Sequence, residues 1–245
     1  MSAEKIKRMR VFAGPNGSGK STIIKEIQKL YSTGTYINAD EIEKSAKEKG
    51  FVNLGDYKLN STPTAFNDYI ENSTLVAKAR EEGYTIDLKL TNNVITIGAD
   101  SNSYEAALIS EYLRRVLIDK QESFSFETVM SHPSKLDILI TARNAGFRNY
   151  LYFISTESPD INVNRVRERV NKGGHPVSEQ KIRERYLRSM DLLFDMLPHC
   201  HRCFFFDNSE DTYLLIGEWT ENRITLETDN IPAWFLKYVY NKFSL

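Results

Sequence analysis

Residues Gly14-Pro15-Asn16-Gly17-Ser18-Gly19-Lys20-Ser21 spell the pattern G-x-x-x-x-G-K-S and decide the fold of this chain. An apolar strand candidate, Met9 to Ala13, comes directly before the stretch, and a helical pattern, Thr22 to Tyr31, follows it. A strand, a glycine-rich turn and a helix in this order are typical of the P-loop. In a P-loop, backbone N–H groups and the positive end of the helix cradle phosphate oxygens. The sequence therefore predicts a nucleoside triphosphate as the first ligand.

Two polar residues of the motif have expected tasks in holding ATP and Mg²⁺. Lys20 is expected to reach the β- and γ-phosphates, and Ser21 is expected to offer its hydroxyl to Mg²⁺. The alternative is a glycine-rich turn that only connects a strand and a helix, which the agreement of both flanking elements disfavours. The predicted ATP contacts are Gly14, Pro15, Asn16, Gly17, Ser18, Gly19, Lys20, Ser21 and Thr22.

The composition favours one soluble domain. The chain has 245 residues, 41% of them hydrophobic, which is enough for one substantial core. Its 32 basic and 33 acidic residues nearly cancel, so the charge favours neither nucleic acid nor an anionic membrane as a partner. We see no signal-peptide pattern and no apolar run that could span a bilayer, so we expect a cytoplasmic protein.

Strand and helix patterns alternate after the P-loop, which predicts a parallel sheet wrapped by helices. Strands are predicted at Met9 to Ala13, Thr35 to Asn38, Ser123 to Phe126, Tyr150 to Ser155 and Cys203 to Asp207. Helices are predicted at Asp40 to Lys49, Ser134 to Ala145, Ile161 to Val170 and Ser178 to Leu197. We expect an α/β, three-layer P-loop fold: one domain over 1–245, with an insertion at about 84–120 and a C-terminal hairpin plus helix at about 212–245. The alternating apolar residues within Gly83 to Asn102 predict a β-hairpin in the insertion.

Asp40 ends a strand-like run, Tyr36 to Asp40. The carboxyl ends of parallel strands open onto one crevice, so this carboxylate is expected to orient an attacking alcohol and take its proton. The alternative is that Asp40 only caps the helix that follows. Asn38, in the same stretch, is a predicted substrate contact.

Glu127 and Thr128 end the next apolar strand and are expected to contact the substrate in the same crevice. An acid that closes an apolar strand is unusual as a plain core residue. The alternative for Glu127 is a cap on the helix after Ser131.

Basic residues gather in two helical segments joined by Gly173-Gly174-His175, which predicts a lid. Arg165 and Arg169 lie four apart and therefore on one helix face. Guanidinium groups on such a face can clamp the transferring phosphate, a role expected for Arg165, Arg169 and Arg185. His175 is expected either to contact the substrate or to stiffen the hinge. Three further arginines are expected to be solvated and paired with Glu168 or Glu184: Arg167, Arg183 and Arg188.

Two other features leave alternatives open. The cluster His199-Cys200-His201-Cys203 permits zinc, redox or buried-cysteine interpretations, and buried cysteines are favoured because the cluster runs into a strand. Asp207 resembles a magnesium-binding strand end, but a turn aspartate that caps the backbone at the strand exit is the favoured alternative. An ATPase that acts as a nucleotide-dependent switch is the alternative to a kinase. Transporter-type ATPases share the P-loop string, but the chain lacks their LSGGQ signature.

Five stretches occur in an order that resembles the zeta toxin-like kinases: GPNGSGKST, INADEI, FSFETVMS, RVRERVNKGGHPVSEQKIRERY and FFFDNS. The resemblance implies a P-loop kinase that transfers the γ-phosphate of ATP to a sugar hydroxyl, with Asp40 as the base. It also implies that the substrate is a nucleotide sugar such as UDP-N-acetylglucosamine, and that a small antitoxin protein is a possible partner. The stretch from Phe51 to Gln121 is longer than in that family and lies where substrate walls would be built.

Overall fold

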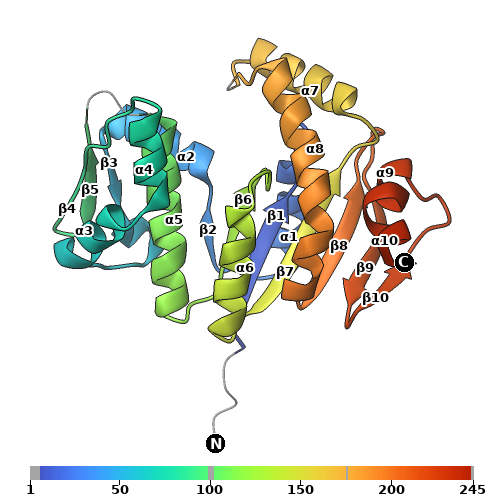
Figure 1. The fold of residues 1–245 in the computed structure, drawn as a ribbon, viewed down its shortest axis with the longest axis horizontal. Coiled ribbons are helices and arrows are strands. Elements are labelled where there is room, and N and C mark those ends of the chain that lie inside the picture. Colours follow the sequence, from blue (N-terminus) through green and yellow to red (C-terminus); the bar gives the residue numbers. More distant parts are fainter. Residues whose placement is uncertain (1–5, 99–101, 175, 244–245) are drawn as a thin grey trace, which may run out of the picture. The chain divides into compact units, whose positions relative to one another are not determined.

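The structure is a computed structural model that describes residues 6–98, 102–174 and 176–243 (Figure 1). Its contacts divide the chain into two compact units. The first holds the residues up to Thr33 and those from Phe126 onward, and the second runs from Gly34 to Ser125. No helix among the described residues is long and apolar enough to cross a membrane.

The first unit is built on a mostly parallel sheet with the strand order β10-β9-β8-β7-β1-β6. Strands β7 and β8 run parallel to β1 and to each other, whereas β9 and β10 form an antiparallel hairpin at one edge. The bounds are β1 Arg8–Ala13, β6 Phe124–Thr128, β7 Arg148–Ser155, β8 Arg202–Asp207, β9 Leu214–Thr220 and β10 Arg223–Leu226.

Helices cover both faces of this sheet, with α6 and α8 in front of it and α1 behind it in Figure 1. The C-terminal hairpin is followed by a short helical segment whose middle turn is a π-helix, η3. The three-layer α/β prediction is confirmed, as are the C-terminal hairpin and helix. The bounds are α1 Lys20–Leu30, α6 Ser134–Asn144, α7 Pro159–Asn171, α8 Glu179–Met196, η2 Leu197–His199, α9 Ala233–Phe235, η3 Leu236–Tyr240 and α10 Asn241–Phe243.

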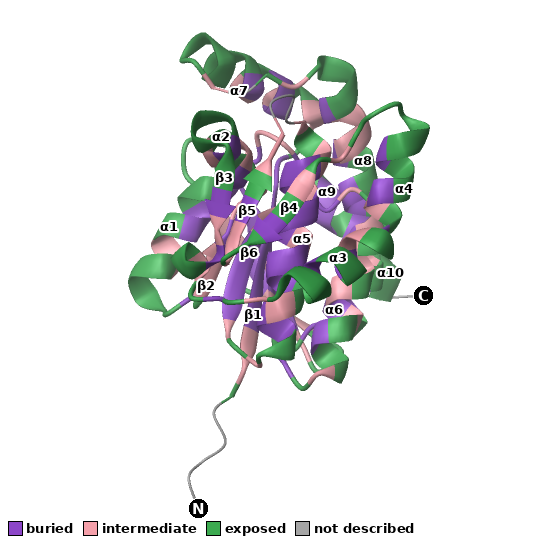
Figure 2. Cartoon of the chain, turned by 90° about the vertical axis from the view of Figure 1, so that its left-hand side faces the viewer, coloured by how far each residue is buried: buried purple, intermediate pink, exposed green. Residues whose placement is uncertain are grey.

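Apolar side chains of the central strands form the core of the first unit, and most of β1 is buried (Figure 2). Phe12 of β1, Phe153 of β7 and Phe205 of β8 are fully buried. Strands buried on both faces read as continuous apolar runs, which is why these segments were recognisable in the sequence. The core fixes the carboxyl ends of β1, β7 and β8, from which the P-loop and two further loops begin.

The second unit has its own antiparallel sheet in the order β3-β5-β4. The hairpin predicted within 83–102 is confirmed as β4 and β5, and its turn uses Asn92 and Asn93 at φ +50° and +66°. Asparagine tolerates this left-handed conformation better than most residues do. The bounds are β2 Thr35–Ile37, α2 Ala39–Lys49, β3 Phe51–Asn53, η1 Leu54–Tyr57, α3 Pro63–Glu71, α4 Thr74–Glu81, β4 Leu88–Thr91, β5 Val94–Ile97 and α5 Ser103–Asp119.

The compact unit is larger than the insertion expected at about 84–120. Strand β3 pairs with β5, so residues from before the expected insertion belong to the same small sheet. The interpretation of the whole chain as one kinase domain stays a prediction.

Candidate functional site

The P-loop joins the end of β1 to the start of α1, as predicted. Its glycines have positive φ values, +147° at Gly14, +80° at Gly17 and +88° at Gly19. A Cβ atom at Gly17 would lie 2.6 Å from the main-chain oxygen of Asn162, and at Gly14 it would overlap the main-chain oxygen of Ile154. Both the conformation and the packing of this loop therefore require glycine.

Lys20 is buried and lies across the inside of the loop. Its Nζ donates hydrogen bonds of 2.9 Å to the main-chain oxygens of Gly14 and of Pro15, and it lies 3.8 Å from Oε1 of Glu127. A buried ammonium group needs such partners, because an unpaired one would cost several kcal/mol. The contacts hold a positive charge where the sequence predicts the β- and γ-phosphates.

Ser21 and Thr22 follow Lys20 in the first turn of α1, and both are exposed. Ser21 can therefore present its hydroxyl to a cation beside a bound phosphate. The residues fit a triphosphate with Mg²⁺, since a buried lysine, a left-handed glycine loop, a helix N-terminus and an accessible hydroxyl occur together.

Two asparagines that the sequence patterns did not indicate bind main-chain oxygens of the loop. Asn162 of α7 donates from Nδ2 to the main-chain oxygen of Asn16 at 2.6 Å, and Asn208, directly after β8, donates from Nδ2 to the main-chain oxygen of Ser18 at 2.9 Å. Asn162 is fully buried. Its position inside a predicted helix offered one signal, because a buried amide on a helix face requires partners.

Glu127 and Thr128 end β6. The Thr128 hydroxyl accepts a hydrogen bond of 3.2 Å from the N–H of Met130, a buried residue at φ +60°. Ser189 of α8 donates to the main-chain oxygen of Val129 at 2.6 Å. These contacts fix a tight turn that keeps Glu127 beside Lys20. The alternative role of Glu127 as a helix cap is wrong, because the N-cap position of α6 is held by Pro133.

The expected lid consists of α7, α8 and the residues between them. The two helices share a small apolar cluster formed by Val163, Val166 and Ile182. Arg183 of α8 pairs with Asp160 at 2.6 Å and with Glu179 at 2.8 Å, so its solvated, paired role is confirmed with different partners from those expected. The exposed pair Arg188–Glu184, at 2.6 Å, is the predicted one.

The three candidate arginines differ in their surroundings. Arg165 donates to the main-chain oxygens of Asn208, Ser209 and Glu210, the last at 3.1 Å. Arg185 lies 3.4 Å from Oδ1 of Asn16, which brings it to the P-loop. Arg169 is exposed near the end of α7, and its main-chain oxygen accepts from the N–H of Gly174 at 2.9 Å. His175 lies outside the described residues.

Asn38 and Asp40 belong to the second unit. The Asn38 side chain is the N-cap of α2 and accepts a 3.0 Å hydrogen bond from the N–H of Asp40. Asp40 is exposed in the first turn of the helix. The interpretation of Asp40 as a cap is therefore wrong, and its predicted catalytic role stays a prediction, as does substrate contact by Asn38.

Asp207 has a structural role. Its carboxylate accepts from the indole Nε1 of Trp234 at 2.7 Å and from both the N–H and the hydroxyl of Ser209 at 3.0 Å. Because these donors occupy both oxygens of a buried carboxylate, the turn interpretation is supported over the magnesium one.

Cys200 and Cys203 are free and buried, which confirms the interpretation favoured from the sequence. Burial raises the pKa of the Cys200 thiol to about 12 and that of Cys203 well above its usual range, which keeps both thiols protonated. Among the described residues, no group of three or more His, Cys, Asp and Glu side chains is arranged to hold a metal ion.

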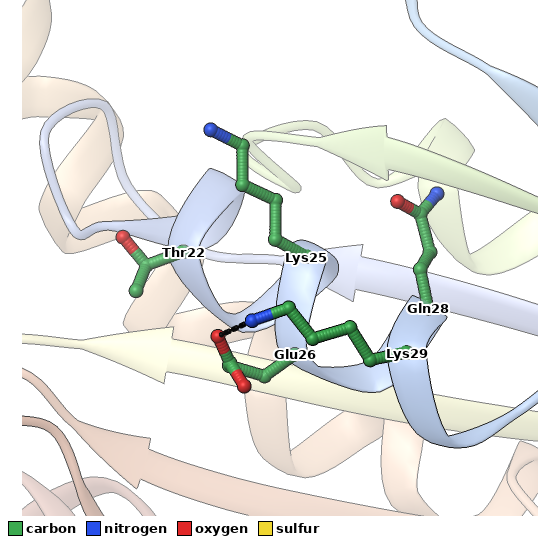
Figure 3. A pocket seen from close by; sticks show the side chains of 5 residues that line it. All are labelled: Thr22, Lys25, Glu26, Gln28 and Lys29. Atoms are coloured by element: carbon green, nitrogen blue, oxygen red, sulfur yellow. Dashed lines mark hydrogen bonds and ion pairs between the residues drawn. The ribbon is translucent and has the colours of Figure 1, made fainter.

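An open hollow of about 540 Å³ lies along α1, away from the loop itself (Figure 3). Its lining residues are exposed except for the half-buried Glu26, which forms a 2.8 Å ion pair with Lys29. Thr22 both lines this hollow and belongs to the predicted ATP contacts. The lining residues are Thr22, Lys25, Glu26, Gln28 and Lys29.

No family model matches the chain. A relative from Haemophilus influenzae, described as an uncharacterized protein, is 32% identical over 69 residues, which cover 28% of this chain and 49% of the relative. The match thus spans about half of that relative's length.

Chains of AvrRxo1-ORF1:AvrRxo1-ORF2 complexes have a similar structure. The native complex matches at a TM-score of 0.54 and 14% identity, over 95% of this chain and 63% of the other. The complex crystallised with sulphate ions matches at 0.53 and 12%, over 98% and 64%, and the one with ATP at 0.52 and 12%, over 98% and 64%. At these identities the likeness shows the fold, and it agrees with the fold that the resemblance to the zeta toxin-like kinases implied.

Proposed function

We propose that this protein is a zeta toxin-like kinase that transfers the γ-phosphate of ATP to a hydroxyl of a small molecule. The observation that carries the proposal is the placement of the buried Lys20 inside a left-handed glycine loop, 3.8 Å from Glu127. A positive charge held in this way is ready for phosphate oxygens. The presence of ATP in one of the AvrRxo1 complexes supports ATP as the nucleotide.

In the proposed reaction the acceptor oxygen attacks the γ-phosphorus, and the bond to the oxygen that bridges the β- and γ-phosphates breaks. Asp40 takes the proton of the acceptor hydroxyl. Lys20 balances charge on the β- and γ-phosphates, and Arg165, Arg169 and Arg185 from the lid balance charge on the transferring group. Mg²⁺, held through Ser21, supplies further charge neutralisation when it is bound.

The proposed acceptor is a nucleotide sugar such as UDP-N-acetylglucosamine, contacted by Asn38, Glu127, Thr128 and His175. A small antitoxin protein is a proposed partner. Two observations support these finer assignments, namely the ordered motifs of the sequence and the fact that the AvrRxo1 matches are two-protein complexes.

The direct test incubates the purified protein with γ-labelled ATP and a metabolite extract, and in parallel with UDP-N-acetylglucosamine alone. A kinase transfers the label to an organic acceptor. Release of the label only as inorganic phosphate would instead favour the ATPase or switch function. Label on another acceptor would refute the nucleotide sugar and keep the kinase.

Asp40→Asn separates these functions further. The variant keeps the backbone N–H that Asn38 binds, so the free energy of unfolding should change little. Loss of a general base typically lowers the rate by about 10²- to 10⁴-fold, so transfer should collapse while ATP still binds. Glu41→Gln, at a neighbouring exposed acid in the same helical turn, is the matched control and should transfer normally. Wild-type transfer by Asp40→Asn would refute the mechanism.

A further inference from the structure

Asn162 and Asn208 contact the P-loop at alternate residues, through the main-chain oxygens of Asn16 and of Ser18. A carbonyl oxygen can only accept, so in each asparagine the amide NH₂ must face the loop. The 2.6 Å separation at Asn162 and the 2.9 Å separation at Asn208 are both hydrogen-bonding distances. The two loop carbonyls are therefore each held pointing toward an asparagine side chain.

The direction of these carbonyls determines the direction of the next N–H groups. In a trans peptide the C=O of one residue and the N–H of the next point to opposite sides, and none of the described peptide bonds is cis. The carbonyl of Asn16 therefore sets the N–H of Gly17, and the carbonyl of Ser18 sets the N–H of Gly19. With both carbonyls turned toward the asparagines, both N–H groups point away from them.

The glycines give independent support for this arrangement. A Cβ atom at Gly17 would lie 2.6 Å from the main-chain oxygen of Asn162, and a Cβ atom at Gly19 would overlap Nδ2 of Asn208. Each asparagine can reach its carbonyl only because the neighbouring loop residue has no side chain.

Both asparagines are themselves held in place. The Thr156 hydroxyl contacts Oδ1 of Asn162, and Arg165 donates to the main-chain oxygen of Asn208. Arg165 and Asn162 lie three residues apart in α7, so one face of this helix supports the loop directly and through Asn208.

We propose that Asn162 and Asn208 are positioning residues that aim the N–H groups of Gly17 and Gly19 at the phosphates of the nucleotide. This inference rests on the proposed nucleotide site and is independent of the acceptor. It also gives Arg165 a second task in the resting protein, which is to hold Asn208.

The test measures the Kd of Mg²⁺-tripolyphosphate and of Mg²⁺-ATP by calorimetry for Asn162→Ala and Asn208→Ala, together with the melting temperature of each variant. Loss of one neutral hydrogen bond should raise each Kd by about five- to tenfold. Asn208→Asp should raise the Kd further, because a carboxylate cannot donate to the main-chain oxygen of Ser18 and repels phosphate. Asn208 is only half-buried, so Asn208→Ala should fold even if Asn162→Ala does not. The Kd values of the Asn208 variants then decide the test.

Asn149→Ala is the matched control. Asn149 is also buried, and its Nδ2 donates to the main-chain oxygens of Leu139 and His199 at 2.7 and 2.9 Å. The variant should lower the melting temperature and leave both Kd values unchanged.

Three outcomes decide the inference. A rise in Kd for Asn208→Ala, with none for Asn149→Ala, supports it. Wild-type Kd values in folded Asn208→Ala and Asn208→Asp overturn it and leave the proposed function intact. Failure of the wild-type protein to bind Mg²⁺-ATP overturns the proposed function, and the inference falls with it.

Discussion

The P-loop and the turn between α7 and α8 both depend on glycine, yet for different reasons. In the P-loop, a Cβ atom at Gly17 would lie 2.6 Å from a main-chain oxygen, so the surrounding structure leaves no room for a side chain. At Gly173 a Cβ atom would meet nothing within 4 Å, and only φ of +85° favours glycine there. Gly17 is therefore required by its neighbours, whereas Gly173 is favoured only by its own backbone conformation. In the same turn, however, a Cβ atom at Gly174 would lie 2.6 Å from Cγ of Arg169.

This difference suits the tasks proposed for the two segments. A loop that binds phosphate gains when its N–H groups are already aimed, because no reorganisation is needed during the reaction. A lid must change its backbone where it joins the protein, and positions with open space around them can do so. The N–H of Gly173 donates to the main-chain oxygen of Val170 at 2.9 Å, which simply ends α7.

Lys20→Ala should produce the largest effect. The variant removes the charge inside the fixed loop, and we expect phosphate transfer to fall by more than about 10³-fold and Mg²⁺-ATP binding to weaken. Lys25→Ala, an exposed lysine of the same helix, should behave as the wild type. For both variants, the rate at which the γ-label of ATP is transferred is measured. An unchanged rate in Lys20→Ala would refute the P-loop assignment.

Arg169→Ala tests the lid side of the comparison. A lid arginine acts after closure, so transfer should fall by about 10²-fold or more while the Kd of Mg²⁺-ATP changes little. Arg167→Ala is the control, since Arg167 is exposed on the same helix and lies 3.8 Å from Glu179. If folded Arg169→Ala has normal specific activity, Arg169 is a surface residue without a role in phosphate transfer.

Gly17→Ala should destabilise the fold through its packing. The new methyl group meets main-chain atoms of Asn162, which cannot rotate away, and the positive φ adds strain. We expect the free energy of unfolding to fall by about 3 kcal/mol or more, as for overpacked and strained sites. Urea titration measures this, and a loss below about 1 kcal/mol would show that the loop is not held as tightly as its contacts imply.

Local sequence patterns predict the P-loop and its flanking elements, but not the contacts that hold the loop. The P-loop, the alternating strands and helices and both hairpins follow from local patterns, and each was predicted from residues that are near one another in the chain. The hydrogen bonds that hold the loop come instead from residues that are distant in the sequence. Asn162 and Asn208 lie 146 and 190 residues from the carbonyls that they bind. An asparagine in a helix and one in an Asp-Asn-Ser turn look ordinary until the fold brings them to the loop.

Contacts between residues that are distant in the sequence also explain why the partners of Arg165 and the extent of the second unit were not predicted. A positive charge on a helix face predicts an anion, but the described partners of Arg165 are the carbonyls of Asn208, Ser209 and Glu210, which follow a distant strand. Strand β3 is only three residues long and could not be recognised alone, although its pairing with β5 enlarges the small sheet.

Gly173→Ala should have the smallest effect and sharpens the comparison most directly. The left-handed conformation costs alanine roughly 1–2 kcal/mol, and no clash adds to it, so the free energy of unfolding should fall by about 1 kcal/mol. Gly50→Ala is a matched control, because Gly50 also follows a helix, at φ +75°, with nothing within 4 Å of its Cβ position. Gly173→Asn should recover part of the loss, since asparagine tolerates this conformation. A fall in stability as large as that of Gly17→Ala would mean that the turn between α7 and α8 is packed as tightly as the P-loop, and the proposed division between a fixed loop and a movable lid would be wrong.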